Sequence, residues 1–273
     1  MRIAVTGASG FVGRHVLTAL LDLDVEITAV TRDANSLGNV HKNVRIVEMD
    51  IAQPSSVSFK QIGSPDVLIH LAWDGLPNYK SLHHFETELP RQYHFLKEMI
   101  EGGLSSLLVT GTCFEYGMQS GALAADLLTV PNNPYGYAKD ALRKQLEFLK
   151  SNKYFKLTWA RLFYMYGEGQ SGASLYSKLK EAVLRGDKVF NMSGGEQLRD
   201  YLSAKEIADQ IVKLAMASQD TGITNICSGN PISVRRLVEQ WIDENNWEID
   251  LNLGYYPYPD YEPMAFWGDR SSN

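Results

Sequence analysis

Apolar runs and helical periodicities alternate along the first 165 residues of the chain. Short apolar or β-branched runs predict strands at residues 3–5, 25–31, 44–49, 67–71, 106–111 and 156–162. Helices are predicted after the first strand as far as residue 21, and over residues 82–101 and 135–149. Pro90 would either kink the second of these helices or mark its start. This alternation is typical of α/β proteins and predicts a doubly wound parallel sheet.

The pattern loosens after residue 166. Helices are predicted over residues 175–185, 205–217 and 234–244, with short strands at 188–190 and 224–227 and an aromatic, proline-rich tail at 255–267. We therefore expect a larger domain over residues 1–165 and a smaller lobe over residues 166–273, with some exchange of elements between the two.

Three glycines, Gly7, Gly10 and Gly13, separate the first strand from the first helix. Such glycines let the chain turn tightly, let the backbone approach a pyrophosphate and let the helix pack closely on the strand. The first helical turn, with Phe11 and Val12, would then offer N–H groups to the phosphates. The alternative is a turn that binds nothing. Although G-x-x-G-x-x-G differs from the commoner G-x-G-x-x-G, we interpret the segment as a dinucleotide-binding turn.

The second strand ends at Thr31, followed by Arg32 and Asp33. This position, about 20 residues past the last glycine, meets the adenosine ribose in a dinucleotide-binding βαβ unit. An acidic residue there would favour NAD, whereas Arg32 favours the 2′-phosphate of NADP. Asp33 weakens this preference because it could neutralise Arg32. We expect NADP as the cofactor, with NAD as the alternative.

Tyr135 and Lys139 lie four residues apart at the start of a predicted helix, and therefore on one face. The ammonium of Lys139 would lower the pKa of the Tyr135 phenol toward neutral pH and could hold the ribose of a nicotinamide cofactor. A hydroxyl at the end of the fifth strand would assist, and both Thr110 and Thr112 stand there. The alternatives are chance spacing on a solvated helix and threonines that only cap the backbone.

Composition and charge exclude several classes of binding partner. The chain has 273 residues and a net charge of −6, which argues against nucleic acid or an anionic membrane as the main partner. Cys113 and Cys227 show no metal-ligand spacing, and we interpret His83, His84 and His94 as surface residues, so no metal site is predicted. The sequence shows no secretory signal and no apolar run long enough to span a bilayer, and we expect a cytoplasmic enzyme.

Eight segments, taken in order, resemble the extended short-chain dehydrogenase/reductases that act on nucleotide sugars. They are T-G-A-S-G-F-V-G (6–13), M-D-I (49–51), H-L-A-W (70–73), T-G-T-C-F-E-Y-G (110–117), Y-G-Y-A-K (135–139), R-L-F-Y-M-Y-G (161–167), L-R-D-Y-L (198–202) and N-I-C-S-G (225–229). The resemblance implies a Rossmann-type domain at residues 1–165 for the dinucleotide and a lobe at residues 166–273 for a nucleotide sugar. It also implies a homodimer, formed through the helix after the fourth strand and the helix that holds Tyr135.

The resemblance assigns roles to individual residues. The family's catalytic hydroxyl lies five residues before the glycine of the Y-G pair, which selects Thr112 over Thr110. Arg199 would hold the diphosphate of the nucleotide sugar. The positions implied along the cofactor are Asp50 and Ile51 beside the adenine, and Leu71 and Ala72 further along.

Departures from the family narrow the reaction. Cys113 and Phe114 follow Thr112 where the 4,6-dehydratases have Asp-Glu, and neither can protonate a departing hydroxyl. The 3,5-epimerase/reductases place a cysteine where Phe114 stands, so their reaction is disfavoured too. Tyr164 replaces an asparagine that many members of the family carry. A second family asparagine, in the helix before the fifth strand, falls near Glu88 in this sequence, so the water relay that this asparagine usually forms is in doubt.

Two reactions remain. One is the NAD(P)H-dependent reduction of a nucleotide-linked 4-keto-6-deoxyhexose, with dTDP as the expected nucleotide, and the other is 4-epimerisation with a retained NAD. Arg32 favours the reductase, because a reductant used once per turnover is normally NADPH. A non-catalytic NADP-binding relative is the alternative of another class, and the intact Thr-Tyr-Lys set argues against it. The residues expected to shape the sugar pocket are Trp73, Asp74, Phe114 and Tyr164.

Overall fold

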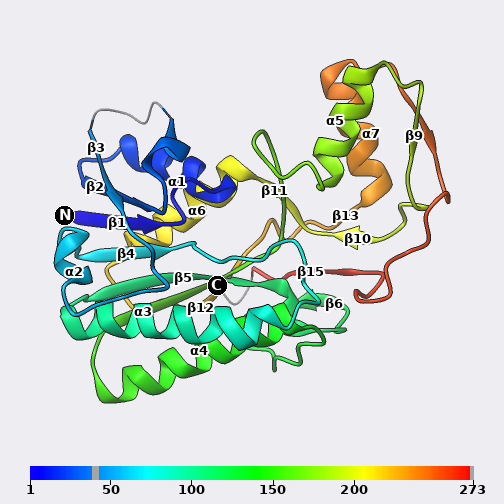
Figure 1. Ribbon diagram of the computed structural model, residues 1–273. Coiled ribbons are helices and arrows are strands. Elements are labelled where there is room, and N and C mark those ends of the chain that lie inside the picture. The colour runs from blue at the N-terminus through cyan, green and yellow to red at the C-terminus, as the bar shows by residue number, and fades with distance from the viewer. Residues whose placement is uncertain (39–42, 271–273) are drawn as a thin grey trace.

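The computed structural model describes residues 1–38 and 43–270. Its centre is a seven-stranded parallel sheet with the order β12-β7-β5-β4-β1-β2-β3 (Figure 1). These strands are β1 (Arg2–Thr6), β2 (Glu26–Thr31), β3 (Val44–Glu48), β4 (Val67–His70), β5 (Ser106–Thr112), β7 (Lys156–Leu162) and β12 (Gly222–Ile226). The strand order reverses between β1 and β4, where ligands bind beyond the carboxyl ends of the strands. The predicted Rossmann-type, doubly wound sheet is confirmed.

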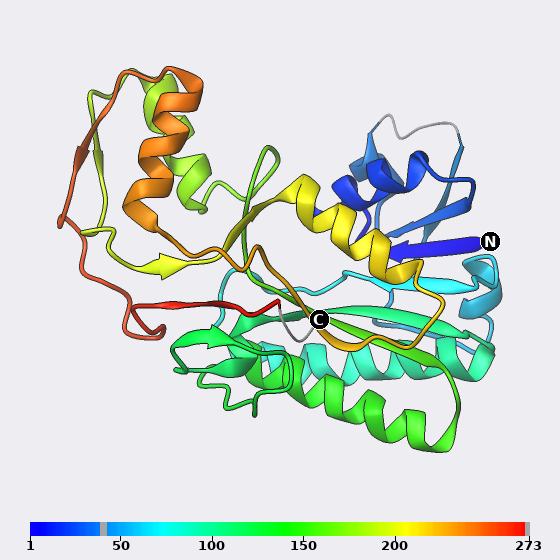
Figure 2. The same ribbon diagram turned by 180° about the vertical axis from the view of Figure 1, so that it is seen from behind.

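Helices cover both faces of this sheet, as opposite views show (Figures 1 and 2). They are α1 (Phe11–Leu21) and α6 (Ala204–Ala215) on one face, and α2 (Ser58–Gln61), α3 (Leu89–Gly102) and α4 (Pro134–Asn152) on the other. The first face has a core that includes Val16 and Ile211, and the second has one that includes Phe95 and Trp159. Burial on both faces explains why the strands read as continuous apolar runs.

A smaller lobe stands beyond the carboxyl edge of the sheet, at the upper right of Figure 1. Its helices, α5 (Leu175–Arg185) and α7 (Val234–Asn245), enclose a separate core that includes Leu179 and Trp241. The remaining strands form four pairs: β6 (Gly121–Leu123) with β15 (Phe266–Gly268), β8 (Tyr164–Tyr166) with β11 (Tyr201–Ser203), β9 (Val189–Asn191) with β14 (Asp250–Asn252), and β10 (Leu198–Arg199) with β13 (Ile232–Ser233). Between these segments the chain returns to the large sheet to add α6 and β12.

The segment after β4 resolves one open prediction. A π-helical turn, η2 (His84–Glu88), precedes α3, and Pro90 lies in the first turn of α3. Proline fits there because a first-turn N–H has no helical acceptor, so Pro90 marks the start of the helix. Two 3₁₀ turns, η1 (Ala34–Leu37) and η3 (Cys113–Tyr116), were not predicted. Within the described residues, no helix combines the length and apolar character needed to cross a membrane.

Candidate active site

The glycine turn forms one wall of a crevice of about 500 Å³ at the reversal between β1 and β4. Gly7 has φ +67°, and a Cβ there would lie 2.8 Å from the backbone nitrogen of Ala72. A Cβ on Gly13 would lie 2.2 Å from the carbonyl oxygen of Gly7, so only glycine allows this approach of helix to strand. The predicted cofactor residues that line the crevice are Gly7, Gly10, Arg32, Asp50, Ile51, Leu71 and Ala72.

The other predicted cofactor residues support the crevice without lining it. Phe11 packs edge-on against His15, and Val12 packs against the core beneath α1. Gly10, the N-cap residue of α1, provides no side-chain cap, so the first turn keeps its N–H groups for an anion. The narrow glycine turn and these donors fit the pyrophosphate of a dinucleotide.

Hydroxyl groups that the sequence analysis missed gather at the end of β2. Thr31 Oγ1 lies 3.2 Å from Ser9 Oγ and 3.2 Å from Ser36 Oγ. Arg14 ties the two serine-bearing loops together by donating to the backbone carbonyls of Ser9 (2.9 Å) and Ser36 (2.6 Å). Serine and threonine are common in loops, so their sequence pattern alone carried no signal.

The two charged residues after Thr31 point to different partners. Asp33 caps η1, with Oδ1 accepting from the backbone nitrogen of Asn35 at 2.9 Å. Arg32 is exposed, and its guanidinium lies 3.9 Å from the carboxylate of Asp74. Asp33 is therefore occupied in its own turn, and Arg32 faces Asp74 instead.

Tyr135 and Lys139 lie in the first turns of α4, which the side chain of Asn133 caps. Both residues are buried. Lys139 Nζ donates to the carbonyl of Thr110 at 2.9 Å and lies 4.0 Å from the centroid of the Trp73 ring. The same nitrogen lies 6.0 Å from the centroid of the Tyr135 ring.

Burial governs the ionisation of this pair. It raises the pKa of the Tyr135 phenol well above its usual value of 10, although a hydrogen bond with Thr112 acts in the opposite direction. It also lowers the pKa of Lys139 to about 7. The expectation that Lys139 depresses the pKa of Tyr135 is wrong for this structure, because desolvation of the phenol dominates. Tyr135 is protonated at neutral pH.

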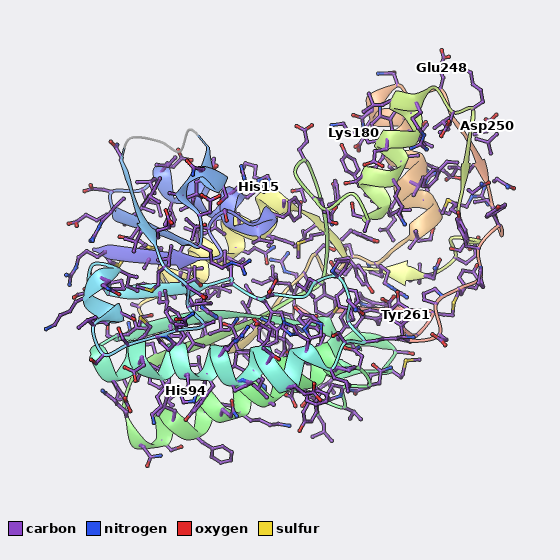
Figure 3. All side chains as sticks on the ribbon, in the orientation of Figure 1. His15, His94, Lys180, Glu248, Asp250 and Tyr261 are labelled. Carbon is purple, nitrogen blue, oxygen red and sulfur yellow. The ribbon has the colours of Figure 1, made fainter. Side chains whose placement is uncertain are left out.

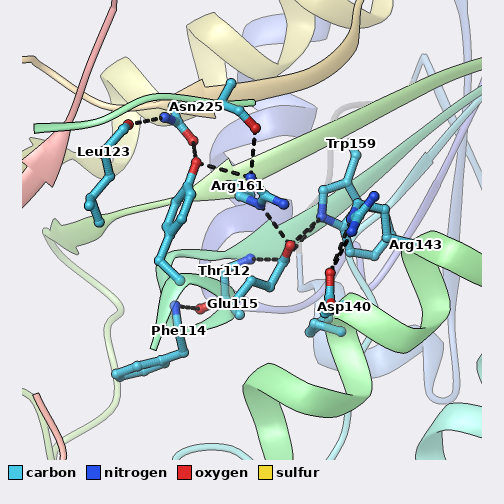
Figure 4. A network of polar contacts seen from close by, with 12 residues as sticks. Thr112, Phe114, Glu115, Leu123, Asp140, Arg143, Trp159, Arg161 and Asn225 are labelled. Carbon is cyan, nitrogen blue, oxygen red and sulfur yellow. Dashed lines mark hydrogen bonds and ion pairs between the residues drawn. The ribbon is translucent and has the colours of Figure 1, made fainter. Parts of the chain in front are cut away.

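Thr112 begins the short turn η3 at the end of β5 (Figure 4). Its Oγ1 accepts from the backbone nitrogen of Phe114 at 3.3 Å, and the same hydroxyl is hydrogen-bonded with the Tyr135 phenol. Thr110, the competing threonine, lies two residues before Thr112 in β5. Its Oγ1 donates to the carbonyl of His70 at 3.4 Å. The hydrogen bond with Tyr135 distinguishes Thr112 from Thr110, and the role of Thr112 as the reactive hydroxyl stays a prediction.

A buried carboxylate, Glu115, holds this turn in place (Figure 4). It accepts from the backbone nitrogen of Thr112 (2.9 Å), from Trp159 Nε1 (3.0 Å) and from Arg161 Nε (2.7 Å). Arg161 also donates to the Tyr116 hydroxyl at 3.0 Å. Sequence reasoning missed Glu115, although Thr-x-x-Glu is the spacing of a capping box and could have revealed it.

A second cavity, of about 970 Å³, is lined by the small lobe and the C-terminal tail. Tyr164 and Arg199 line it, as do Glu262 and the tail tyrosines Tyr256, Tyr258 and Tyr261, the last labelled in Figure 3. Arg199 is buried, and its Nη2 lies 2.8 Å from Glu262 Oε2. Sequence reasoning missed Glu262, because the tail shows no periodicity.

The predicted sugar-contacting residues do not all meet. Trp73 and Asp74 line the first crevice, because they directly follow β4 at the strand-order reversal. Phe114 lines neither cavity and packs against Tyr79 and Tyr135. Of these four residues, only Tyr164 lines the second cavity, and contact of the other three with a sugar stays a prediction.

The turn that carries Thr112 lies between residues of the two cavities. Tyr135 packs edge-on against Trp73 of the first crevice, with ring centroids 5.9 Å apart. Cys113, beside Thr112, packs in one cluster with Tyr164 of the second cavity. Thr112, Tyr135 and Lys139 line neither cavity themselves, and they are separated from the two cavities by these packed side chains.

The interpretation of the histidines as surface residues is wrong for His84. This side chain is buried because it packs on Trp73, accepting from Trp73 Nε1 at 3.1 Å and donating from Nε2 to the carbonyl of Asn78 at 2.9 Å. His83 is partly exposed, and His94 is exposed on the outer side of α3 (Figure 3).

Glu88 is a second buried carboxylate near the site. Its ligand atoms lie within 4.8 Å of those of Asp74 and His83. Its Oε2 accepts from Gln92 Nε2 at 2.9 Å and from the backbone nitrogen of Asp74 at 3.2 Å. The hydrogen bond to Asp74 and the contact of Glu88 with His83 at 3.7 Å bring these three side chains close together.

Comparisons with known proteins identify the family. The family model described as "NAD dependent epimerase/dehydratase family" matches residues 3–227. The chain is similar to a dTDP-6-deoxy-L-talose 4-dehydrogenase (NAD(+)) of Aggregatibacter actinomycetemcomitans, 32% identical over 99% of this chain and 100% of the relative. It is also 27% identical to a GDP-6-deoxy-D-talose 4-dehydrogenase of the same organism, over 99% of this chain and 89% of that relative.

A solved structure confirms the fold. The UDP-N-acetylglucosamine 4-epimerase from Methanobrevibacter ruminantium M1, in complex with UDP-N-acetylmuramic acid, has a TM-score of 0.87 at 22% identity, covering 99% of this chain and 89% of that one. The glycine turn, the seven-stranded sheet and the family match over most of its length agree, and the chain belongs to the NAD-dependent epimerase/dehydratase family of enzymes.

Proposed function

We propose that the enzyme reduces the 4-keto group of a nucleotide-linked 4-keto-6-deoxyhexose, with dTDP as the nucleotide. The two relatives support this substrate class, since both are named as 4-dehydrogenases of nucleotide-linked 6-deoxytaloses, and reduction is the reverse of that oxidation. The observation that carries the role of Tyr135 is its protonation state, because the phenol is buried and its pKa is raised above the usual value of 10. At neutral pH it therefore holds the proton that the C4 oxygen takes up on reduction.

In this reaction Tyr135 donates its proton to the C4 oxygen as negative charge develops there. Thr112, whose hydroxyl is hydrogen-bonded with Tyr135 in the free protein, donates a hydrogen bond to the same oxygen. Lys139 holds the ribose of the cofactor. The reduced dinucleotide, when bound, supplies the hydride that adds to C4.

The second cavity suits the nucleotide part of the substrate. Arg199 offers a guanidinium for the diphosphate, and the tail tyrosines Tyr256 and Tyr258 offer ring faces for the base. With the sugar beside Tyr164, C4 would approach the turn that carries Thr112.

We propose NADPH as the preferred reductant. Arg32 supplies a positive charge at the end of β2, and the hydroxyls of Ser9, Thr31 and Ser36 supply donors beside it. Asp33 also lines this crevice, and its Oδ1 accepts from the backbone nitrogen of Asn35 rather than from Arg32.

NAD-dependent 4-epimerisation is the second candidate. It is favoured by the position of Asp74, whose carboxylate faces Arg32 and offsets the charge that would select NADPH.

We also propose a homodimer formed through α3 and α4, because Tyr137 and Phe148 on α4 are 54% and 76% exposed. Light scattering of the purified protein would give twice the chain mass.

The deciding experiment follows the absorbance of reduced nicotinamide when the protein is mixed with dTDP-4-keto-6-deoxyglucose and NADPH or NADH. Stoichiometric loss of the signal is expected, faster with NADPH. No loss, together with NAD released on denaturing the purified protein, would favour the epimerase.

A further inference from the structure

Lys139 must stay charged in an environment that disfavours charge. The side chain is 2% exposed, and its Nζ contacts a backbone carbonyl at Thr110 and the face of Trp73, both uncharged groups. Burial brings the pKa of the amine to about 7. Any further loss of stabilisation would leave it neutral at physiological pH.

The titratable groups that face Lys139 come from four elements. His70 lies on β4 and His84 on η2, and both are neutral because burial lowers the pKa of each. Tyr135, on its own helix, is a neutral phenol. The two remaining groups are carboxylates, Glu115 from η3 and Glu88 from η2, and both favour the ammonium form of Lys139.

The two carboxylates differ in their own partners. Glu115 forms a buried ion pair with Arg161 at 2.7 Å, so a neighbouring cation already balances its charge. Glu88 has looser cationic neighbours, His83 at 3.7 Å and Arg91 at 3.6 Å, and both are partly exposed to water. Glu88 itself is 4% exposed. The field of Glu88 is therefore less compensated on the buried side, toward Lys139.

Two hydrogen bonds fix the orientation of the Glu88 carboxylate. Its Oε2 accepts from the backbone nitrogen of Asp74, the residue after Trp73, and from Gln92 Nε2. Gln92 Oε1 in turn accepts from His70 Nε2 at 2.7 Å. The carboxylate is thus anchored against the segment whose indole contacts the lysine ammonium.

We propose that Glu88 is a positioning residue that keeps Lys139 protonated in the working pH range. The proposal rests on the proposed function, because it requires the ammonium of Lys139 to hold the ribose of the cofactor. Glu88 does not touch the reacting atoms. It acts through the charge state of Lys139.

The test is the pH dependence of two quantities, the kcat for the keto sugar and the dissociation constant of NADPH measured by tryptophan fluorescence. Glu88→Gln keeps the shape and the acceptor oxygen but removes the charge. In both profiles, the pH at which the alkaline limb falls is expected to be lower by about one unit than in the wild type. Glu86→Gln removes the same charge from an exposed position on η2 and is expected to leave both limbs unchanged.

A second variant protects the test against a folding defect. Arg91→Gln, at a half-exposed position, removes a cation beside Glu88 and is expected to move the alkaline limb up. A uniform drop in kcat with unmoved limbs in Glu88→Gln would overturn the proposal and leave Glu88 a structural residue. If that variant does not fold, an unmoved limb in Arg91→Gln overturns it. Absence of wild-type turnover would instead remove the proposed function, while the binding profile still tests Glu88.

Discussion

Glu262 holds the guanidinium of Arg199 by two contacts, 2.8 Å from Nη2 and 3.2 Å from Nε. The Nη1 atom donates to the backbone carbonyls of Leu198 and Met264. The edge of Arg199 that could bind a phosphate in a bidentate manner is therefore already occupied by a carboxylate from the tail. A diphosphate in the second cavity must share Arg199 with Glu262 or displace it.

Glu262→Gln tests this competition. Removing the negative charge should tighten the binding of dTDP, measured by calorimetry, because the diphosphate no longer meets a carboxylate at Arg199. The free protein should lose about 2 kcal/mol in its free energy of unfolding, since a buried guanidinium loses its counter-ion. Weaker dTDP binding would mean that Glu262 itself holds the nucleotide.

Tyr135→Phe should lower kcat by about 10²–10⁴-fold, because only the proton donor is lost. The dissociation constant of the cofactor should stay nearly unchanged. Tyr79→Phe is the matched control, since this ring packs against Tyr135 with centroids 5.6 Å apart and its hydroxyl is given no role in the proposed reaction. Full activity of Tyr135→Phe would remove the proposed mechanism.

Arg32→Ala should weaken NADPH binding by about tenfold or more and affect NADH little, because only the 2′-phosphate uses the guanidinium. Titration of each reduced cofactor by fluorescence measures the two constants. Arg45→Ala removes an exposed arginine from the neighbouring strand β3 and serves as the control. Equal effects of Arg32→Ala on both cofactors would contradict NADPH selection by this residue.

His70 makes folding stability depend on pH. Its side chain is fully buried between Thr6 and Gln92, and burial lowers its pKa from 6.5 to about 3. The unfolded chain then binds more protons between these pH values, so the stabilisation is complete above pH 6.5 and is lost as the pH falls toward 3.

The contribution of His70 to that slope is at most about 1.4 kcal/mol per pH unit. His70→Leu should therefore flatten the pH dependence of the free energy of unfolding in denaturant titrations between pH 6.5 and 4. His94→Leu, on the exposed side of α3, should leave the slope as in the wild type. Parallel slopes for His70→Leu and wild type would show that His70 does not titrate in this window.

The sequence predicted the parts of the molecule whose cause is local. The run from Ile3 to Val5 and the glycines after it define a strand and a turn through their own conformations, and the crevice formed there as expected. Burial on both faces gives such strands a signal that a short window can detect. The same holds for α5, whose predicted range of residues 175–185 matches the structure.

The missed features depend on residues far apart in the chain. The ionisation of Tyr135 follows from rings contributed by other elements, and no window around it contains them. Glu262 meets Arg199 across 63 residues, and His84 is buried because Trp73 covers it. Local pattern carries no information on such contacts, which is why the chemistry of the site was predicted less well than its position.

The turn that carries Thr112 depends on a residue synthesised much later. Tyr116, in that turn, donates to Asn225 Oδ1 at 2.8 Å across 109 residues, and Asn225 lies in β12, the last strand of the sheet. Contacts of such sequence separation close late in folding, because a long loop must first be ordered. The glycine crevice lies at strands made early in translation, whereas the core beneath α1 also includes Ile211 of α6. A nascent chain therefore pairs the strands around the crevice first, and the turn that carries Thr112 reaches its final set of partners only when β12 has docked at the edge of the sheet.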